Sequence, residues 1–307
     1  MIPTESRPYA RAFVDYARDR PEVVCITGDL TQPCEVDGFR DAYPERFINA
    51  GMAEQNMIGI ASGLAREGLL PCVHSFGVFL TRRALDQISM AIAYPRVRVR
   101  LMGFLPGITS PGGVTHQAID DLAIMCALPN MTVLDLADVS EIRAVHSVLD
   151  RVDGPAYCRV LRGDVPACFD TPPVLGKLRR LSSGGDVCVV SSSIATGEAM
   201  RAVSALKRRG VSVCHLHAWT LKPFDDPDLP AALESAGGVV TVENHLVAGG
   251  LGTAVAETMV RHRIARPFAK LGLQDTYAVG GTQLYLMKRF GLSAEHIIRA
   301  VDEVLGA

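Results

Sequence analysis

The residues best suited to chemistry lie in short segments where a carboxylate, an aromatic ring or an imidazole stands among small residues. Four such segments occur: Gly28 to Thr31, Asn49 to Gln55, His74 to Phe79 and Gly107 to Gln117. Glu54 precedes a small and apolar run, Met57 to Ala65, that predicts a buried helix. A carboxylate there either stabilises the helix N-terminus through the dipole or shares a proton with a ligand nitrogen in a low-dielectric cleft. The residues alone leave both interpretations open.

Aromatic and imidazole groups follow in the next segments. Phe76 and Phe79 are three residues apart, a spacing typical of core packing that would also let one ring stack on a flat heterocycle. His116 stands in a Gly-rich loop, where the residues leave a ligand-binding role and a packing role equally open. Gly249-Gly250-Leu251-Gly252 resembles a weak phosphate nest, but it lacks the spacing of the dinucleotide and P-loop motifs. It indicates a tight turn into a helix.

The elements that must position these segments alternate regularly. Short β-branched runs separate longer amphipathic stretches, which is typical of parallel strands joined by crossover helices. Predicted strands are 22–27, 71–74, 97–102, 131–134, 156–161, 186–191, 211–217 and 239–243. Predicted helices are 52–66, 81–94, 117–127, 140–151, 195–209, 229–236 and 251–263. Ligands bind at the carboxyl ends of such strands, and the four segments fall near those ends.

A proline-rich stretch divides this pattern. Residues 163–173 contain three prolines and predict a linker. We therefore expect an α/β protein of two consecutive three-layer domains with mostly parallel sheets, at 1–165 and 181–307, joined by a linker at 166–180. Polar residues alternate in Val97-Arg98-Val99-Arg100, although a sheet covered on both faces should be apolar. We expect Arg98 and Arg100 to reach a subunit interface.

Composition excludes several classes of function. The 307 residues are 48% hydrophobic and 21% charged, with 31 basic and 33 acidic side chains and a net charge of −2. A net charge this small gives no large electrostatic field that would bind nucleic acid or an anionic membrane. No basic or apolar leader and no long apolar run occurs, so a cytoplasmic protein is expected. The eight cysteines show no metal-ligand spacing; buried thiols in a reducing compartment, and no metal site, are predicted.

Taken together, these segments resemble the pyrimidine-binding domain of thiamine diphosphate enzymes in the transketolase branch. The match runs in order through Gly51-Met52-Ala53-Glu54-Gln55-Asn56-Met57, Phe76-Gly77-Val78-Phe79, Thr115-His116-Gln117, Leu128-Pro129-Asn130-Met131 and Leu161-Arg162. Residues 181–307 then resemble the transketolase C-terminal domain, through Leu221-Lys222-Pro223-Phe224-Asp225 and Val242-Glu243-Asn244-His245. The resemblance covers nearly the whole chain.

The resemblance implies a two-component enzyme. Full transketolases carry a diphosphate-binding domain with a Gly-Asp-Gly motif, which this chain lacks. The chain is similar to the second subunit of a split transketolase, with thiamine diphosphate as cofactor. Mg²⁺ and the diphosphate are then expected on a partner, the diphosphate-binding N-terminal subunit, in an assembly with two copies of each chain.

The resemblance also implies roles for residues around the cofactor. Glu54 corresponds to the glutamate that hydrogen-bonds the pyrimidine nitrogen and favours the imino tautomer, which takes the proton from the thiazolium carbon. Phe79 with Phe76 would stack on the pyrimidine. Met52 would support the bent cofactor, and Asp29 would line the same pocket.

For a small sugar substrate, His116 matches a group that contacts hydroxyls, and Arg162 and Arg7 match arginines that bind the substrate phosphate. The chain departs from the family at Phe104 to Gly107 and Ser110 to Gly113, where many transketolases carry a further histidine and an acidic loop. The donor and acceptor therefore stay open.

Three alternatives stay open as well. The Ala53-Glu54-Gln55 triplet is shared with the beta subunits of 2-oxo-acid dehydrogenases and with 1-deoxyxylulose-5-phosphate synthases. The Thr-His-Gln loop and the missing paired histidines argue against the first, and the missing arginine-bearing donor loop argues against the second. A scaffold without activity is disfavoured by the intact set of Glu54, Phe79 and His116.

Overall fold

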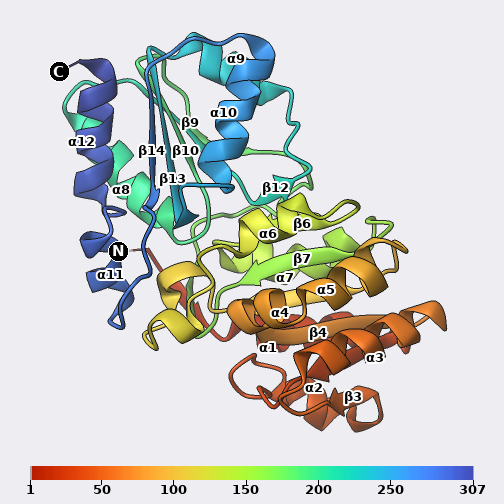
Figure 1. The fold of residues 1–307 in the computed structure, drawn as a ribbon. Helices are drawn as coiled ribbons and strands as arrows, with labels where there is room; N and C mark the ends of the chain where they lie inside the picture. Colours follow the sequence, from red (N-terminus) through yellow and green to blue (C-terminus); the bar gives the residue numbers. More distant parts are fainter. Residues whose placement is uncertain (1, 307) are drawn as a thin grey trace.

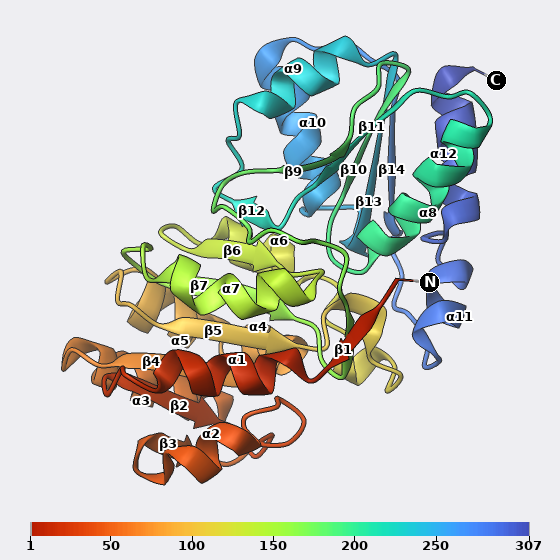
Figure 2. The ribbon, with the colours of Figure 1, turned by 180° about the vertical axis from the view of Figure 1, so that it is seen from behind.

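Two mostly parallel sheets organise the chain, and the computed structural model describes residues 2–306 of it. Figures 1 and 2 show each sheet between helices on both faces, with the second sheet standing above the edge of the first. The predicted α/β architecture of two three-layer units is confirmed.

The first sheet has seven strands. In spatial order they are β12 (Thr220–Lys222), β6 (Thr132–Asp135), β7 (Ala156–Val160), β5 (Arg100–Phe104), β4 (Leu70–Phe76), β2 (Val23–Thr27) and β3 (Phe47–Asn49). All pairs are parallel except β12 with β6. Every residue of β2, β4, β5 and β7 is buried. Burial on both faces explains why these strands are mostly apolar and do not alternate between apolar and polar residues.

Helices cover both faces of this sheet. One face carries α1 (Pro8–Ala17), α2 (Asp37–Ala42) and α7 (Val139–Leu149), which share a core cluster with alternate strand residues. The other face carries α3 (Glu54–Arg66), α4 (Gly77–Arg83), α5 (Leu85–Gln87), a π-helical turn (Ile88–Ala93) and α6 (Asp121–Ala127). The helix predicted at 81–94 is thus broken into three pieces, and α1 was not predicted.

The second sheet has five strands. In spatial order they are β14 (Phe268–Leu273), β13 (Gly238–Leu246), β10 (Val187–Ser191), β11 (Val213–His217) and β9 (Arg179–Ser182), with only β9 antiparallel. One face packs against α8 (Ala195–Arg208) and α12 (Ala294–Leu305), and the other against α9 (Asp228–Ser235) and α10 (Leu251–His262). The short α11 (Gln283–Arg289) precedes α12. The strand β14 and the two last helices were not predicted.

One short strand pair crosses the sequence boundary between the units, and a second pair lies at the edge of the first unit. β12 comes from the second half of the chain but extends the first sheet. Near the N-terminus, β1 (Thr4–Ser6) pairs with β8 (Asp164–Pro166), so the chain start is tied to the segment after β7. Residues 167–178, within the predicted linker, form no helix or strand. The exact domain limits stay a prediction.

The expectation that Arg100 reaches a subunit interface is wrong. Arg100 is 1% exposed, and its guanidinium donates to the carbonyls of Leu149, Val152 and Gly154 at 2.6–3.1 Å. These carbonyls belong to the C-terminal end of α7 and the turn after it, so the charge satisfies backbone groups inside its own domain. Arg98 is exposed, and the expectation that it reaches a subunit interface stays a prediction.

The prediction that the cysteines are mainly buried agrees with the structure. Six of the eight cysteines are buried and two are partly buried, all of them free thiols. Among residues 2–306, no helix combines the length and the apolar character needed to cross a membrane.

Candidate active site

The candidate site begins at Glu54, the first residue of α3. This helix starts just beyond β3, at the carboxyl edge of the first sheet. Glu54 is 6% exposed, and its Oε1 accepts a hydrogen bond from Nη1 of Arg83 at 2.8 Å. The helix N-terminus and the guanidinium both place positive charge next to this carboxyl group.

Two aromatic rings and one imidazole lie together at the same edge. Phe76 ends β4 and Phe79 lies in the first turn of α4, with ring centroids 5.5 Å apart. The His116 ring lies 5.3 Å from Phe79 and 5.9 Å from Phe76, edge-on to both. Thr115 Oγ1 lies 2.8 Å from His116 Nδ1. The three residues singled out from the sequence therefore form one cluster, and Arg83, whose Cζ lies 3.8 Å from the Phe79 ring centre, connects it to Glu54.

The loop that carries His116 is held by the second domain. The side chain of Asn244 accepts from the Ile108 amide at 2.9 Å and donates to the Pro106 carbonyl at 3.0 Å. Further along, Gln117 Nε2 donates to the Ser110 and Val279 carbonyls. The Val-Glu-Asn-His motif of β13 thus supports the His116 loop from 136 residues away in the sequence.

A buried ion pair anchors the other end of that loop. Arg159 and Asp121 are both fully buried and bonded through two guanidinium nitrogens, and Arg159 also donates to the carbonyls of Ala118 and Asn244. Burial by itself would raise the pKa of the Asp121 carboxyl, but the charge and hydrogen bonds of Arg159 hold it below its usual value. The pair and its hydrogen bonds therefore link β7, α6 and β13.

Asp29 and Met52 lie shortly after the ends of β2 and β3, and their roles at the cofactor stay a prediction. The Asp29 amide donates to Asn49 Oδ1 at 3.0 Å, and Gly51 donates to the same oxygen at 3.1 Å. Asp29 itself has a left-handed backbone, with φ of 61°. Met52 is 81% exposed, so its side chain is not buried within this chain.

The two arginines expected to bind phosphate lie near each other but differ in their partners. Arg7 precedes α1, forms an ion pair with Asp37, and donates its backbone N–H to the Gly163 carbonyl at 2.8 Å. Arg162 is exposed, and no ion pair among residues 2–306 includes it. Between them, burial raises the pKa of the Glu35 carboxyl, while the Gly163 N–H and both arginines oppose that rise. Arg162 is the more available of the two cations.

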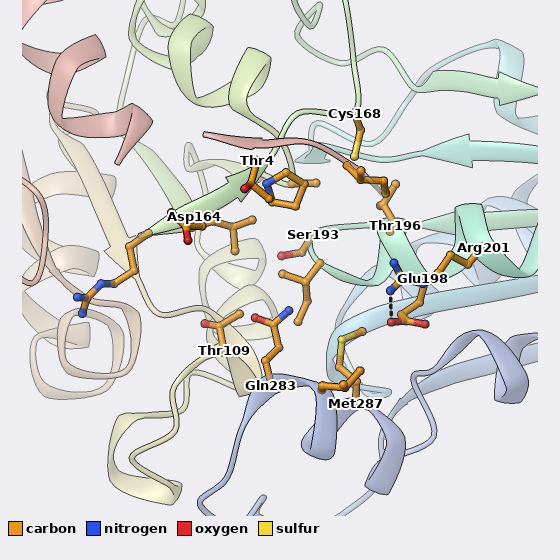
Figure 3. A pocket seen from close by; sticks show the side chains of 18 of the residues that line it. Thr4, Thr109, Asp164, Cys168, Ser193, Thr196, Glu198, Arg201, Gln283 and Met287 are labelled. Carbon is orange, nitrogen blue, oxygen red and sulfur yellow. Dashed lines mark hydrogen bonds and ion pairs between the residues drawn. The ribbon is translucent and has the colours of Figure 1, made fainter. Parts of the chain in front are cut away.

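Arg162 also borders a pocket of about 350 Å³ between the domains. Figure 3 shows Thr4 and Asp164 on one side of it and the ion-paired Glu198 and Arg201 on the other. The pocket is lined by two acidic side chains, Asp164 and Glu198, and two basic ones, Arg162 and Arg201, so its charges are balanced. No residue of the Glu54 cluster lines it.

The main residue that the sequence analysis missed is Arg83. The signal was present: a carboxylate predicted to be buried needs a charged partner, and two arginines follow Phe79 within one helical turn. Sequence spacing could not show which of the two would face Glu54.

Comparisons with known families agree with this geometry. Residues 6–166 match the transketolase pyrimidine-binding domain, and residues 176–297 match the transketolase C-terminal domain. An uncharacterized transketolase family protein of Sinorhizobium fredii is 38% identical, over 99% of this chain and 89% of the relative. The 6-deoxy-6-sulfo-D-fructose transketolase subunit SqwH of a Clostridium species is 36% identical, over 96% of this chain and 92% of the relative.

Solved structures show a similar fold, and one of them shows a similar division of the enzyme into chains. A structure described as a split gene transketolase, inactive beta4 tetramer, superposes with a TM-score of 0.87 at 36% identity, covering 97% of both chains. The transketolase of Campylobacter jejuni shares the fold, with a TM-score of 0.81 at 17% identity, but this chain covers only 47% of it. The chain therefore belongs to the transketolase family, in which it has the two domains and the length of a subunit of the split enzymes.

Proposed function

We propose that this chain is the pyrimidine-binding subunit of a two-component, thiamine diphosphate-dependent transketolase. It would transfer a two-carbon ketol unit from a ketose phosphate donor to an aldehyde acceptor, and only with a diphosphate-binding partner. The observation that carries this proposal is the buried Glu54 carboxylate, which Arg83 links to the ring of Phe79.

The residues present fit the pyrimidine half of the cofactor. A nitrogen heterocycle needs a hydrogen-bonding group at a ring nitrogen and an apolar face, and Glu54, Phe79 and the exposed Met52 offer these. Bound thiamine diphosphate supplies a carbanion at its thiazolium ring, which adds to a carbonyl. Glu54 would hold the proton at the pyrimidine nitrogen, and Phe79 would orient the ring.

On the substrate side, His116 is half-buried and can donate to or accept from sugar hydroxyls. Arg162 would bind a terminal phosphate with two parallel hydrogen bonds. Arg7 would contribute its charge while staying paired with Asp37.

A partner subunit is supported by the length of the relatives. This chain spans 46% of a 1-deoxy-D-xylulose-5-phosphate synthase of Thioalkalivibrio sulfidiphilus and 47% of the Campylobacter transketolase. The structural neighbour made only of the beta chain is described as inactive. We infer that the partner holds the diphosphate and Mg²⁺, that two copies of each chain assemble, and that the enzyme acts in cytoplasmic carbohydrate metabolism.

One second function is favoured by a specific observation. The synthase of Thioalkalivibrio sulfidiphilus is 33% identical over 97% of this chain, so the main competitor is the transfer of a two-carbon acyl unit from a 2-oxo acid, which releases the carboxylate as CO2. Supplying the reconstituted complex with either a ketose phosphate or pyruvate, and following which one is consumed, separates the two reactions.

The proposal is tested by Glu54→Gln in that reconstituted complex. The variant keeps the shape of the side chain but cannot hold the proton, so ketol transfer should fall by at least about a hundredfold while the complex still assembles. Glu67→Gln, an exposed position just after α3, is the matched control. Activity of Glu54→Gln equal to that of the control would refute the proposed site.

A further inference from the structure

Arg83 connects two groups of the candidate site that are distant in sequence. Its Nη1 donates to Glu54 Oε1 at 2.8 Å, and its Cζ lies 3.8 Å from the centre of the Phe79 ring. The Glu54 side chain is 6% exposed, whereas half of the Arg83 side chain is exposed. The contact therefore joins a buried carboxylate to a cation at the solvent edge.

Such an arrangement favours one orientation of both side chains. A buried carboxylate is costly unless a cation and hydrogen bonds compensate it. The half-exposed guanidinium stays partly hydrated, so its own desolvation is small. Stacking on Phe79 restricts the plane of the guanidinium and fixes the direction of its N–H groups.

The backbone of Arg83 is also held, from the same helix as Glu54. The Gln55 side-chain amide donates to the Arg83 carbonyl at 3.1 Å. Two successive residues at the start of α3 thus bind Arg83, one through its side chain and one through its backbone. Gln55, the last residue of the Ala53-Glu54-Gln55 triplet, therefore has a structural role: it binds the backbone of Arg83.

The preceding arginine points to another part of the site. Arg82 Nε donates to both carboxylate oxygens of Asp120, at 3.1 and 3.0 Å. Asp120 belongs to the segment between His116 and α6. Arg82 and Arg83 therefore brace α4 on two sides, and only Arg83 contacts Glu54.

We infer that Arg83 is a positioning residue for Glu54, an inference that rests on the proposed function. Arg83 holds one carboxylate oxygen, Oε1, while Oε2 accepts no hydrogen bond within residues 2–306. Glu54 Oε2 is therefore free to bond with the pyrimidine nitrogen of the cofactor. Arg83 acts through Glu54 and Phe79 and touches neither sugar nor reacting carbon.

Arg83→Met tests this role, because Met fills similar space without charge or N–H groups. In the reconstituted complex we expect kcat to fall about tenfold to a hundredfold, while the Kd for thiamine diphosphate changes much less. The near-ultraviolet circular dichroism of the bound cofactor, recorded without sugar, should lose the signal of the imino tautomer. Arg83→Lys, which keeps the charge, should restore part of both readouts.

Arg82→Met is the matched control. It removes an ion pair one residue away, so any loss from weaker bracing of α4 should appear there, without a change in the cofactor spectrum. Tighter cofactor binding with full kcat in Arg83→Met would show that Arg83 only occupies the pyrimidine site before binding, and would overturn the inference. Identical kcat and spectrum in the wild type and Arg83→Met would overturn it too. Both results leave the proposed function intact, because that function fails only if the wild-type complex transfers no ketol unit.

Discussion

Glu243 and Gly250 approach so closely that a Cβ on the glycine would overlap with Glu243 Oε2. The same carboxylate accepts hydrogen bonds from the Leu251 and Gly252 amides at 2.7 and 2.8 Å, at the start of α10. Burial raises the pKa of Glu243 to about 7, although these two amides oppose the rise. The chain's own carboxylate therefore fills the place of an external anion, and the predicted structural turn is confirmed.

Gly250→Ala should destabilise the chain. The new methyl group cannot fit beside Glu243, so either the carboxylate leaves its two amides or α10 shifts, and we expect a loss of about 2–4 kcal/mol in unfolding free energy. Urea denaturation of the purified chain measures it. Gly63→Ala, in α3 with no atom within 4 Å of the new Cβ, should be neutral or slightly stabilising. Equal effects of the two substitutions would contradict this account.

Asn244→Ala should loosen the loop that carries His116. The substitution leaves the buried Ile108 amide and Pro106 carbonyl without their partner, at about 1–3 kcal/mol for each unsatisfied group. Hydrogen exchange of residues 106–116 should become faster, while exchange in β2 and β4 stays slow. Unchanged protection of the loop would show that Gln117 and the Arg159 network hold it without Asn244.

The sequence predicts strands well where burial is complete on both faces. The strands β10 and β2 are apolar except for a buried hydroxyl residue at the end of each, and their ends were predicted to within one residue. Arg100 was misread because a buried charge looks like a surface charge until its carbonyl partners are known. The helix of residues 81–94 was predicted as continuous because its composition does not signal a π-helical turn.

For the candidate site, the sequence could identify groups but not their partners. Glu54 and Arg83 are 29 residues apart, and Ile108 and Asn244 are 136 apart. No local period links such pairs, because they meet only through the order of strands in the sheets. Chemistry-bearing residues at strand ends were therefore predictable, whereas the contacts that orient them required the fold.

Stability should fall in acid because histidines are buried in neutral form. His74 is fully buried, and burial lowers its pKa to about 3. Its Nε2 lies 2.7 Å from the Tyr9 hydroxyl. The unfolded chain takes up this proton near pH 6.5, whereas the folded chain does so only near pH 3, so stability present above pH 6.5 is lost as the pH falls toward 3.

His74→Gln tests this linkage. The amide can keep the hydrogen bond to Tyr9 but does not titrate, so the decline in unfolding free energy from pH 6.5 to 5 should be smaller by about 2 kcal/mol than in the wild type. His262→Gln, at the exposed end of α10, serves as the control and should follow the wild-type curve. A wild-type slope retained in His74→Gln would mean that the other buried histidines account for the acid loss.

The phosphate assignment predicts different effects for the two arginines. Arg162 has no ion-pair partner among the described residues, so Arg162→Ala should remove a free phosphate ligand and raise the KM for a ketose phosphate about tenfold to a hundredfold, with kcat nearly unchanged. Arg7→Ala also breaks the pair with Asp37 and leaves that carboxylate beside Glu35, so it should lower both affinity and stability. An unphosphorylated ketose is the control substrate, and its kinetics should not change in Arg162→Ala. If both ketoses lose affinity equally, Arg162 supports the pocket between the domains and does not bind phosphate.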